Sequence, residues 1–178
     1  MNTSMINRLM ERAPFAVNYQ GTFALDKFKA AFKAAPYDAY IFNTHTSDKP
    51  GEHWLATIGL DETVYFFDSY GFTKKRFSDI QQFITDNCSE MRMAGSACLQ
   101  GVGSTTCGDY CVVFLLLIMR GWSCERFYLN MLRQPNSHER DHQIRLFIKQ
   151  LTLLLAVPQA SGSLEPLHVQ LVQPFCDL

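Results

Sequence analysis

The chain has 178 residues, of which 47% are hydrophobic and 19% charged, and its net charge is −1. This balance is typical of a globular protein with a substantial core, and we expect residues 1–178 to form a single domain. A near-neutral chain lacks the excess positive charge that attracts nucleic acid, so DNA is not an expected partner. The longest apolar run, from Val112 to Met119, is too short to span a membrane, and no membrane partner is predicted.

The first residues and the cysteines bear on the cellular compartment. Met1 to Pro14 has neither the apolar core nor the small-residue cleavage site of a secretory signal. The six cysteines include no C-x-x-C pair, and the chain is too long to be a disulfide-stapled miniprotein. These features predict an intracellular protein with mostly free thiols, although an even number of cysteines is also compatible with disulfide bonds.

Hydrophobic spacing and chain-breaking residues divide the first part of the chain into short elements. Pro14 ends the first of them, and the side chain of Asp26 is in place to cap the second. In chain order, we predict a helix at residues 2–12, a helix at 26–34, a strand at 39–43 and a polar loop at 44–52.

The middle of the chain is predicted to form a β-hairpin. Residues 53–60 and 63–68 are two largely apolar strands, joined at Asp61-Glu62 and ended by Gly71. If the hairpin closes at this turn, residues whose numbers sum to about 121 to 123 face one another.

The second half is predicted to be mainly helical. Ser78 is expected to cap one helix, and Thr105 or Thr106 to cap the helix that begins at Cys107. The latter helix is apolar nearly all round, so we expect it to be buried against a sheet. The predicted elements are a helix at 78–87, a short strand at 91–99, helices at 107–120, 124–133 and 137–155, a Ser/Gly/Pro-rich linker at 158–166 and an apolar tail at 167–178. Strands flanked by helices predict an α+β fold with a central mixed sheet.

The start of the apolar helix carries the strongest indication of chemistry. Cys107 is its first residue and Gly108 follows. A helix N-terminus and a nearby imidazolium lower the pKa of a thiol, and the exposed N–H groups there are donors that an oxyanion needs. Gly108 would let a substrate backbone approach. An isolated cysteine is more often a buried apolar residue, as Cys111 is expected to be, but the context of Cys107 favours a nucleophile.

His53 is the candidate base. It enters an aromatic and apolar strand directly before Trp54, where an unpaired imidazole would be costly. Asp68 ends the neighbouring strand, and the hairpin register brings it to His53. The carboxylate would fix the imidazole tautomer and leave the second nitrogen for Cys107. The alternative is a purely structural histidine–aspartate hydrogen bond.

The other histidines have simpler interpretations. His138 and His142 have the i, i+4 spacing of a metal site. No third ligand is evident, however, and the charged residues between them, including Asp141, favour a solvated helix face, so no metal is predicted. His45 lies in the polar loop and could touch substrate or be a surface residue, while His168 is uninformative.

Gln100 lies seven residues before Cys107. Its side-chain amide could donate to an oxyanion together with the backbone N–H of Cys107. The intervening Gly101-Val102-Gly103 would let Gln100 fold back over the thiol. A loop glutamine is ordinarily a surface residue, so this interpretation depends on its spacing to Cys107.

Together, these segments resemble the active-site segments of the adenain family, the adenovirus maturation proteases, and more distantly those of the Ulp/SENP deSUMOylating proteases. The interval from Gln100 to Cys107 follows adenain spacing, whereas deSUMOylases usually have one residue fewer. The order of histidine before cysteine excludes papain-type enzymes. The resemblance covers roughly residues 38–120 and is carried by His53-Trp54, Phe67-Asp68-Ser69-Tyr70-Gly71 and Gln100-x6-Cys107-Gly108, with Ile41-Phe42-Asn43-Thr44 and Phe72 in support.

The resemblance implies a papain-like or Ulp1-like cysteine protease fold in which a buried helix carries the nucleophile. Trp54 and Gly108 would border the substrate groove, which in this family accepts small residues, often Gly. Asp68 stands where adenain has Glu and follows the deSUMOylase pattern. The implied catalytic roles are nucleophile for Cys107, general base and then acid for His53, orienting carboxylate for Asp68 and oxyanion donor for Gln100.

Adenain uses DNA and a disulfide-linked viral peptide as activators, and the present sequence bears on the need for each of them. The chain is near neutral, and its only basic cluster, Lys74-Lys75-Arg76, is interpreted as a solvated turn. Cys88 lies roughly where the peptide-linking thiol would be, with a buried or idle cysteine as the alternative. No cofactor is therefore predicted to be required, with a peptide or DNA activator as the alternative.

The leading hypothesis is a monomeric cysteine endopeptidase that cleaves viral capsid or precursor proteins during virion maturation. Its place would be the assembly site inside the host cell and the virion itself, and related proteases of virophages and virus-like transposons suggest a similar origin. The alternative is a deubiquitinase or deSUMOylase that acts on host ubiquitin-like conjugates. A third option, an inactive binding module on the same fold, is disfavoured by the intact set of four residues.

Overall fold

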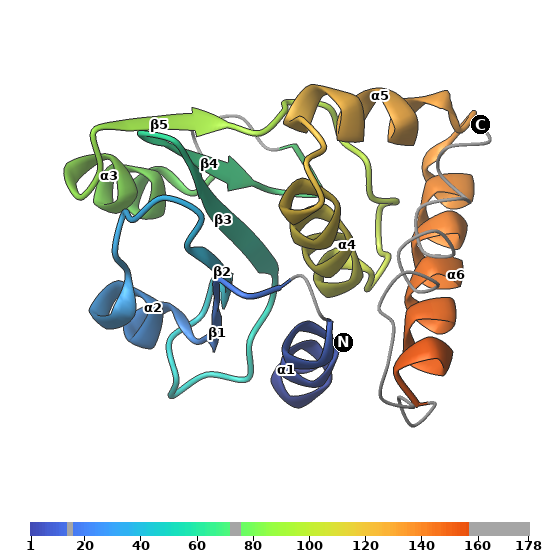
Figure 1. The fold of residues 1–178 in the computed structure, drawn as a ribbon, viewed down its shortest axis with the longest axis horizontal. Coiled ribbons are helices and arrows are strands. Elements are labelled where there is room, and N and C mark those ends of the chain that lie inside the picture. Colours follow the sequence, from blue (N-terminus) through green and yellow to red (C-terminus); the bar gives the residue numbers. More distant parts are fainter. Residues whose placement is uncertain (14–15, 72–75, 157–178) are drawn as a thin grey trace, which may run out of the picture.

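A five-stranded sheet in the order β1-β2-β3-β4-β5 forms the centre of the molecule (Figure 1). The structure is a computed structural model that describes residues 1–13, 16–71 and 76–156. Strands β2, β3 and β4 are antiparallel, whereas β1 pairs in parallel with β2 and β5 in parallel with β4, so the sheet is mixed. The strands are β1 (Tyr19–Phe23), β2 (Ala39–Asn43), β3 (Trp54–Leu60), β4 (Thr63–Phe67) and β5 (Glu90–Met93).

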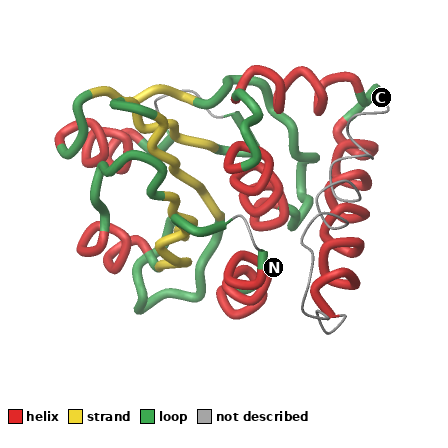
Figure 2. The backbone as a smooth tube through the Cα atoms, viewed as in Figure 1, coloured by secondary structure: helices red, strands yellow, loops and turns green. Residues whose placement is uncertain are grey.

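Helices cover both faces of this sheet. Figures 1 and 2 show α2 and α3 on one side of the strands and the other helices on the opposite side, with α4 nearest to the sheet. This arrangement confirms the predicted α+β class. The helices are α1 (Thr3–Arg12), α2 (Leu25–Ala31), α3 (Ser78–Asp86), α4 (Cys107–Met119), α5 (Cys124–Arg133) and α6 (Ser137–Ala156).

The two faces of the sheet belong to two separate hydrophobic clusters. In β2, Ala39 and Ile41 join the cluster that contains α4, whereas Tyr40 and Phe42 join the cluster beneath α2 and α3. Successive side chains of a strand point to opposite faces, so a strand buried on both sides is apolar throughout. All five residues of β2 are buried accordingly.

Helix α4 is held firmly against the sheet. Its residues from Tyr110 to Ile118 are buried, as its apolar composition predicts. The ring of Phe114 stacks on that of Phe67 at the end of β4, with 4.2 Å between centroids. Since Asp68 follows Phe67, the contact that anchors α4 also fixes the position of this carboxylate.

Strand β1 is missing from the sequence prediction. Its five residues, Tyr-Gln-Gly-Thr-Phe, lack a continuous apolar run, and Gly21 at its centre weakens the strand signal. The strand exists because it pairs with β2, which no local pattern reveals. The predicted strand at 91–99 is also shorter than expected, since only residues 90–93 pair with β4.

Two predicted helix caps are wrong. Asp26 lies inside α2, whose N-cap is Ala24, and its carboxylate instead accepts hydrogen bonds from the backbone N–H and the hydroxyl of Ser47. Ser78 is the first residue of α3 and does not cap it. In both cases a tertiary or backbone contact replaces the local cap. Asn2 and Ser123 do cap their helices, α1 and α5.

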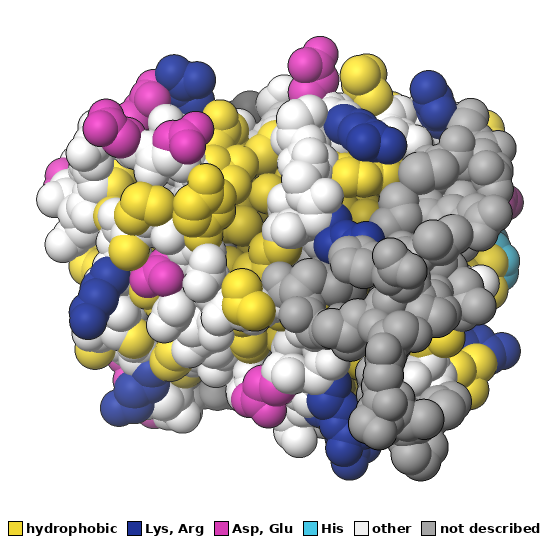
Figure 3. All heavy atoms as spheres, in the orientation of Figure 1, with side chains coloured by type: hydrophobic (Ala, Val, Ile, Leu, Met, Phe, Trp, Pro, Cys, Tyr) yellow, Lys and Arg dark blue, Asp and Glu magenta, His cyan; other side chains and the backbone are white. Residues whose placement is uncertain are grey.

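The predicted linker at 158–166 and tail at 167–178 lie outside the described residues. In Figure 3, hydrophobic side chains gather over the strands while most charged side chains lie toward the periphery of this face. Within residues 1–13, 16–71 and 76–156, no helix is long and apolar enough to cross a membrane.

Replacing Phe114 with Ala should lower the free energy of unfolding by about 3–5 kcal/mol, because the change removes a fully buried ring and leaves a cavity against Phe67. Urea unfolding followed by circular dichroism would measure this loss. Leu153→Ala is the control, since Leu153 is 61% exposed and its loss should change stability by about 0.5 kcal/mol or less. Equal effects of the two changes would contradict the described packing.

Candidate active site

Three of the six predicted site residues, His53, Trp54 and Cys107, line a cleft of about 830 Å³. One wall comes from the loop before β3, a second from the segment after Cys98 that leads into α4, and the first residues of α1 close one end. Its lining includes His53, Trp54, Tyr70, Cys98, Ser104 and Cys107. The cleft is thus built from segments that lie far apart in the sequence.

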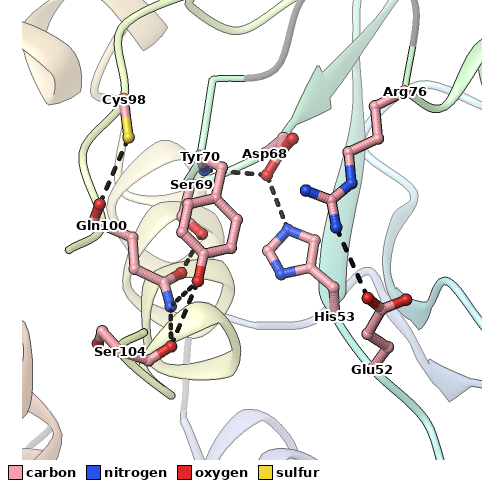
Figure 4. Close-up of polar contacts among 9 residues, drawn as sticks. All are labelled: Glu52, His53, Asp68, Ser69, Tyr70, Arg76, Cys98, Gln100 and Ser104. Atoms are coloured by element: carbon pink, nitrogen blue, oxygen red, sulfur yellow. Dashed lines mark hydrogen bonds and ion pairs between the residues drawn. The ribbon is translucent and has the colours of Figure 1, made fainter. Parts of the chain in front are cut away.

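His53 and Asp68 flank the hairpin formed by β3 and β4. The observed register pairs Ala56 with Phe67 and Thr57 with Phe66, within the range predicted from the turn. The Nε2 atom of His53 lies 2.8 Å from Oδ1 of Asp68, and both side chains are buried (Figure 4). The predicted contact between them is therefore confirmed, and it leaves Nδ1 as the second polar atom of the imidazole.

Two aromatic rings flank the imidazole of His53. The ring of Tyr70 lies 5.0 Å away, and the ring of Phe77 lies nearly parallel at 6.0 Å. The faces of aromatic rings attract cations, so this setting favours a protonated imidazole. The backbone N–H of Tyr70 also donates to Oδ1 of Asp68 at 3.0 Å, which holds the carboxylate in place.

The environments of His53 and Cys107 favour an ion pair. Burial alone would lower the pKa of His53, yet its hydrogen bonds to Asp68 and Cys107 raise that pKa to about 9. Burial opposes ionisation of the Cys107 thiol, but hydrogen bonds from His53 and from the backbone N–H groups of Trp54 and Gly108 lower its pKa. A thiolate beside an imidazolium is the reactive form of a cysteine nucleophile.

Gln100 is buried, with only 1% of its surface exposed, and its side chain is fully engaged. Its Oε1 accepts a hydrogen bond from the hydroxyl of Ser69 at 2.7 Å. Its Nε2 donates to the carbonyl oxygen of Ser104 at 2.7 Å and to the hydroxyl of Tyr70 at 3.3 Å (Figure 4). Gln100 thus reaches Ser104, three residues before Cys107, and Tyr70 lies between Gln100 and His53; that Gln100 folds over the thiol stays a prediction.

Asp141 is an important residue that the sequence analysis misplaced. It was expected on a solvated face of α6, but it is only 5% exposed. Its carboxylate accepts hydrogen bonds from the backbone N–H of Gly101 at 3.2 Å and from the hydroxyl of Thr106 at 3.1 Å. Asp141 therefore holds both ends of the loop that precedes Cys107 in place. The missed signal is its helical spacing to the buried Ile144, which puts Asp141 on the apolar face.

Gly108 does not lie in an open wall of the cleft. A Cβ atom there would come within 3.1 Å of the Trp54 ring and 3.2 Å of Met1. The indole N–H of Trp54 donates to the carbonyl oxygen of Met1 at 3.1 Å. Gly108 thus allows Trp54 and Met1 to pack over the start of α4, while Trp54 itself lines the cleft.

Charged residues border the cleft on the side of the loop before β3. Glu52 forms ion pairs with His45 at 3.4 Å and with Arg76 at 3.6 Å. All three residues line the cleft, in agreement with the interpretation in which His45 can touch substrate. The first two residues of the predicted basic cluster, Lys74-Lys75, fall outside the described part of the chain.

The remaining candidates lie elsewhere. His138 is largely exposed beside Glu139, and Cys88 is half-buried with a pKa raised by burial. Among the described residues, no three or more His, Cys, Asp or Glu side chains gather as a metal site would require. All described cysteines are free.

The geometry can support acyl transfer to a thiol. A thiol with a lowered pKa begins a buried helix, an imidazole hydrogen-bonds to it, and a buried carboxylate contacts the imidazole. Backbone N–H groups at the start of α4 are suited to stabilise an oxyanion.

Solved structures of two proteins share this fold. ChlaDub1 from Chlamydia trachomatis superposes with a TM-score of 0.51 over 88% of this chain and 80% of its own, at 14% identity. The ASFV pS273R protease gives a TM-score of 0.50 over 89% of this chain and 68% of its own, also at 14% identity. At this level of identity the likeness shows the fold alone.

In sequence, the chain is similar to adenovirus proteases, as its motifs indicated. It is 31% identical to the protease of Human adenovirus B serotype 3 over 116 residues, 57% of this chain and 50% of that protein. It is 28% identical to the protease of Porcine adenovirus A serotype 3 over 129 residues, 64% of this chain and 62% of that protein. The chain spans about half the length of the curated relatives it matches first. No family model matches the sequence.

Iodoacetamide should alkylate Cys107 at a lower pH than it alkylates an ordinary thiol, because hydrogen bonds lower the pKa of the Cys107 thiol. Cys88 and Cys98 provide internal references, since burial raises the pKa of both. Peptide mapping by mass spectrometry would give the rate at each cysteine as a function of pH. If Cys107 reacts only at the higher pH at which Cys88 and Cys98 react, the thiolate–imidazolium pair does not exist.

Replacing Asp68 with Asn should move the titration of His53 to a pH below about 9, because the carboxylate that stabilises the imidazolium is gone. The protonated form would then be lost earlier as the pH rises. Titration of the imidazole Cε1–H signal by NMR measures the midpoint directly. Asp79→Asn, which removes an exposed acid in the first turn of α3, should leave it unchanged. An unchanged midpoint in the Asp68 variant would rule out this cause of the shift.

Proposed function

We propose that the chain is a cysteine endopeptidase of the adenovirus protease type, with Cys107 as nucleophile, His53 as base and acid, and Asp68 as orienting carboxylate. The observation that carries the proposal is the buried imidazole of His53, which contacts the Asp68 carboxylate at 2.8 Å and the thiol at the start of α4. The similarity to adenovirus proteases supports the same class of reaction.

In the first half of the reaction, the Cys107 thiolate attacks the carbonyl carbon of the scissile peptide bond. The electron pair of the carbonyl moves to oxygen and forms an oxyanion, which the N–H of Cys107 and the hydrogen bonds formed around Gln100 stabilise. The imidazolium of His53 then gives its proton to the leaving amine, the C–N bond breaks, and a thioester remains on Cys107.

In the second half, neutral His53 takes a proton from water, and the resulting hydroxide attacks the thioester. The C–S bond breaks, the carboxylic acid product leaves, and Cys107 returns to its thiolate form. Asp68 keeps the imidazole oriented and stabilises its positive charge in both halves. Neither step requires a metal or an organic cofactor.

The groove beside Trp54 favours small residues at the cleaved bond, such as Gly. The Trp54 ring is packed over Gly108 and tied to Met1, which narrows the approach to Cys107. By its similarity to adenovirus proteases, the substrates we propose are viral capsid or precursor proteins, cut inside the host cell and the virion during maturation.

A second candidate is an isopeptidase that acts on ubiquitin-like conjugates. Its support is the fold shared with ChlaDub1, together with a groove suited to a C-terminal glycine. The chemistry would be the same and only the substrate would differ.

Co-expression with the major capsid protein of the same virus would test the leading function. Wild-type protein should cleave it, and Cys107→Ala should abolish cleavage, since the thiol that forms the thioester is gone. Cys88→Ala, which removes a half-buried thiol outside the cleft, is the matched control and should cleave normally.

A vinyl-sulfone probe built on ubiquitin or SUMO separates the two candidates. Labelling of Cys107 without capsid cleavage would favour the isopeptidase. Capsid cleavage that persists in Cys107→Ala would refute both.

A further inference from the structure

Tyr70 contacts each of the polar side chains around the thiol, although neither its spacing nor its motif assigns it a role. Its backbone N–H donates to Asp68, and its ring lies 5.0 Å from that of His53. Its hydroxyl lies 3.3 Å from Nε2 of Gln100. Figure 4 shows Tyr70 between Gln100 and His53.

The Tyr70 side chain reaches the cleft, whereas Gln100 is buried behind it. Tyr70 lines the cleft together with His53 and Cys107. Gln100 is 1% exposed, and one of its amide hydrogens is committed to the carbonyl oxygen of Ser104 at 2.7 Å. The Nε2 atom of Gln100 donates to the Tyr70 hydroxyl at 3.3 Å, so Tyr70 links the buried amide to the cleft.

The hydroxyl of Tyr70 makes one long hydrogen bond beside the cleft. The carbonyl oxygen of Ser104 lies 3.4 Å away, beyond the usual 2.7–2.8 Å for such a bond. That oxygen also accepts the shorter bond from Gln100. A bond from the hydroxyl to a negative oxygen in the cleft would replace this long contact with a shorter one.

The geometry points to Tyr70 as a further catalytic residue, whose hydroxyl donates a hydrogen bond to the oxyanion formed when Cys107 attacks the substrate carbonyl. Gln100 donates in turn to the Tyr70 oxygen and makes it a stronger donor. This inference rests on the proposed function and deepens it, because the buried Gln100 then acts through Tyr70.

The hydroxyl is well placed for this role before any substrate binds. The N–H bond to Asp68 fixes the backbone of Tyr70, and Ser69 holds the far end of the Gln100 side chain. Donors that are fixed in advance need no reorganisation in the transition state. Burial and the neighbouring Cys107 raise the pKa of Tyr70, so the hydroxyl keeps its proton at neutral pH.

Tyr70→Phe isolates the hydroxyl, since it keeps the ring beside His53 and the backbone bond to Asp68. With a fluorogenic peptide that ends in Gly-Gly, kcat should fall at least about tenfold, towards the 10²- to 10³-fold cost of losing one oxyanion donor, with KM little changed. Alkylation of Cys107 by iodoacetamide forms no oxyanion, so its rate and pH profile should be unchanged. Tyr37→Phe, which removes the hydroxyl of an exposed tyrosine outside the cleft, is the control.

A peptide aldehyde that ends in glycinal gives a second readout that needs no turnover. It forms a tetrahedral adduct with Cys107, and its affinity should fall in Tyr70→Phe by a factor similar to the fall in kcat. The matching peptide alcohol, which forms no adduct, should bind both proteins equally.

The outcomes separate the inference from the proposed function. Unchanged kcat and aldehyde affinity in Tyr70→Phe would overturn the role of the hydroxyl. So would a parallel loss of alkylation, because the hydroxyl would then act on the thiol or on His53. If the wild-type protein hydrolyses neither peptide nor capsid protein, the proposed function fails, while the aldehyde comparison still decides the role of Tyr70.

The double variant Tyr70→Phe with Gln100→Ala tests whether the two side chains act as one unit. If Gln100 acts through Tyr70, the double variant should be about as impaired as the more affected single variant. Losses that multiply would show two independent donors and overturn the proposed link between them.

Discussion

The burial of helix α4 against β3 and β4 is the constraint on which the rest of the site depends. The helix is apolar nearly all round and can be stable only in the interior, where Phe114 stacks on Phe67. Because Asp68 directly follows Phe67 and Cys107 opens the helix, the same packing sets Cys107 beside the ends of the hairpin. Hydrophobic burial, which is not directional, thus fixes the relative positions of groups whose chemistry depends on direction.

The polar side chains of the site are buried, and burial opposes their ionisation. Their charged forms are stable because they form hydrogen bonds with one another. Burial disfavours both the imidazolium of His53 and the thiolate of Cys107, yet the hydrogen bonds among Asp68, His53 and Cys107 overcome that penalty. The same low dielectric strengthens these bonds, so each partner matters more than it would in water. Aromatic rings on either side of His53 add to the stability of its charged form.

A second set of contacts supports the loop between Gln100 and Cys107. Asp141 reaches from α6 to hold both ends of this loop, and Ser69 holds the Gln100 amide from the strand side. Trp54 and Met1 pack over Gly108 at the start of α4. The site is therefore preorganised from three directions, as a reaction that passes through an oxyanion requires.

The amino-acid sequence was enough to predict the helices, the β3–β4 hairpin, the contact of His53 with Asp68 and the place of Cys107 at the start of a buried helix, because periodicity, turn residues and register are local properties. It could not determine β1, which exists only through its pairing with β2. Nor could it predict that Asp141 is buried, that Trp54 packs over Gly108, or that the Tyr70 hydroxyl lies next to the Gln100 amide. Those features arise where segments distant in the chain pack together, so only the tertiary structure could decide them.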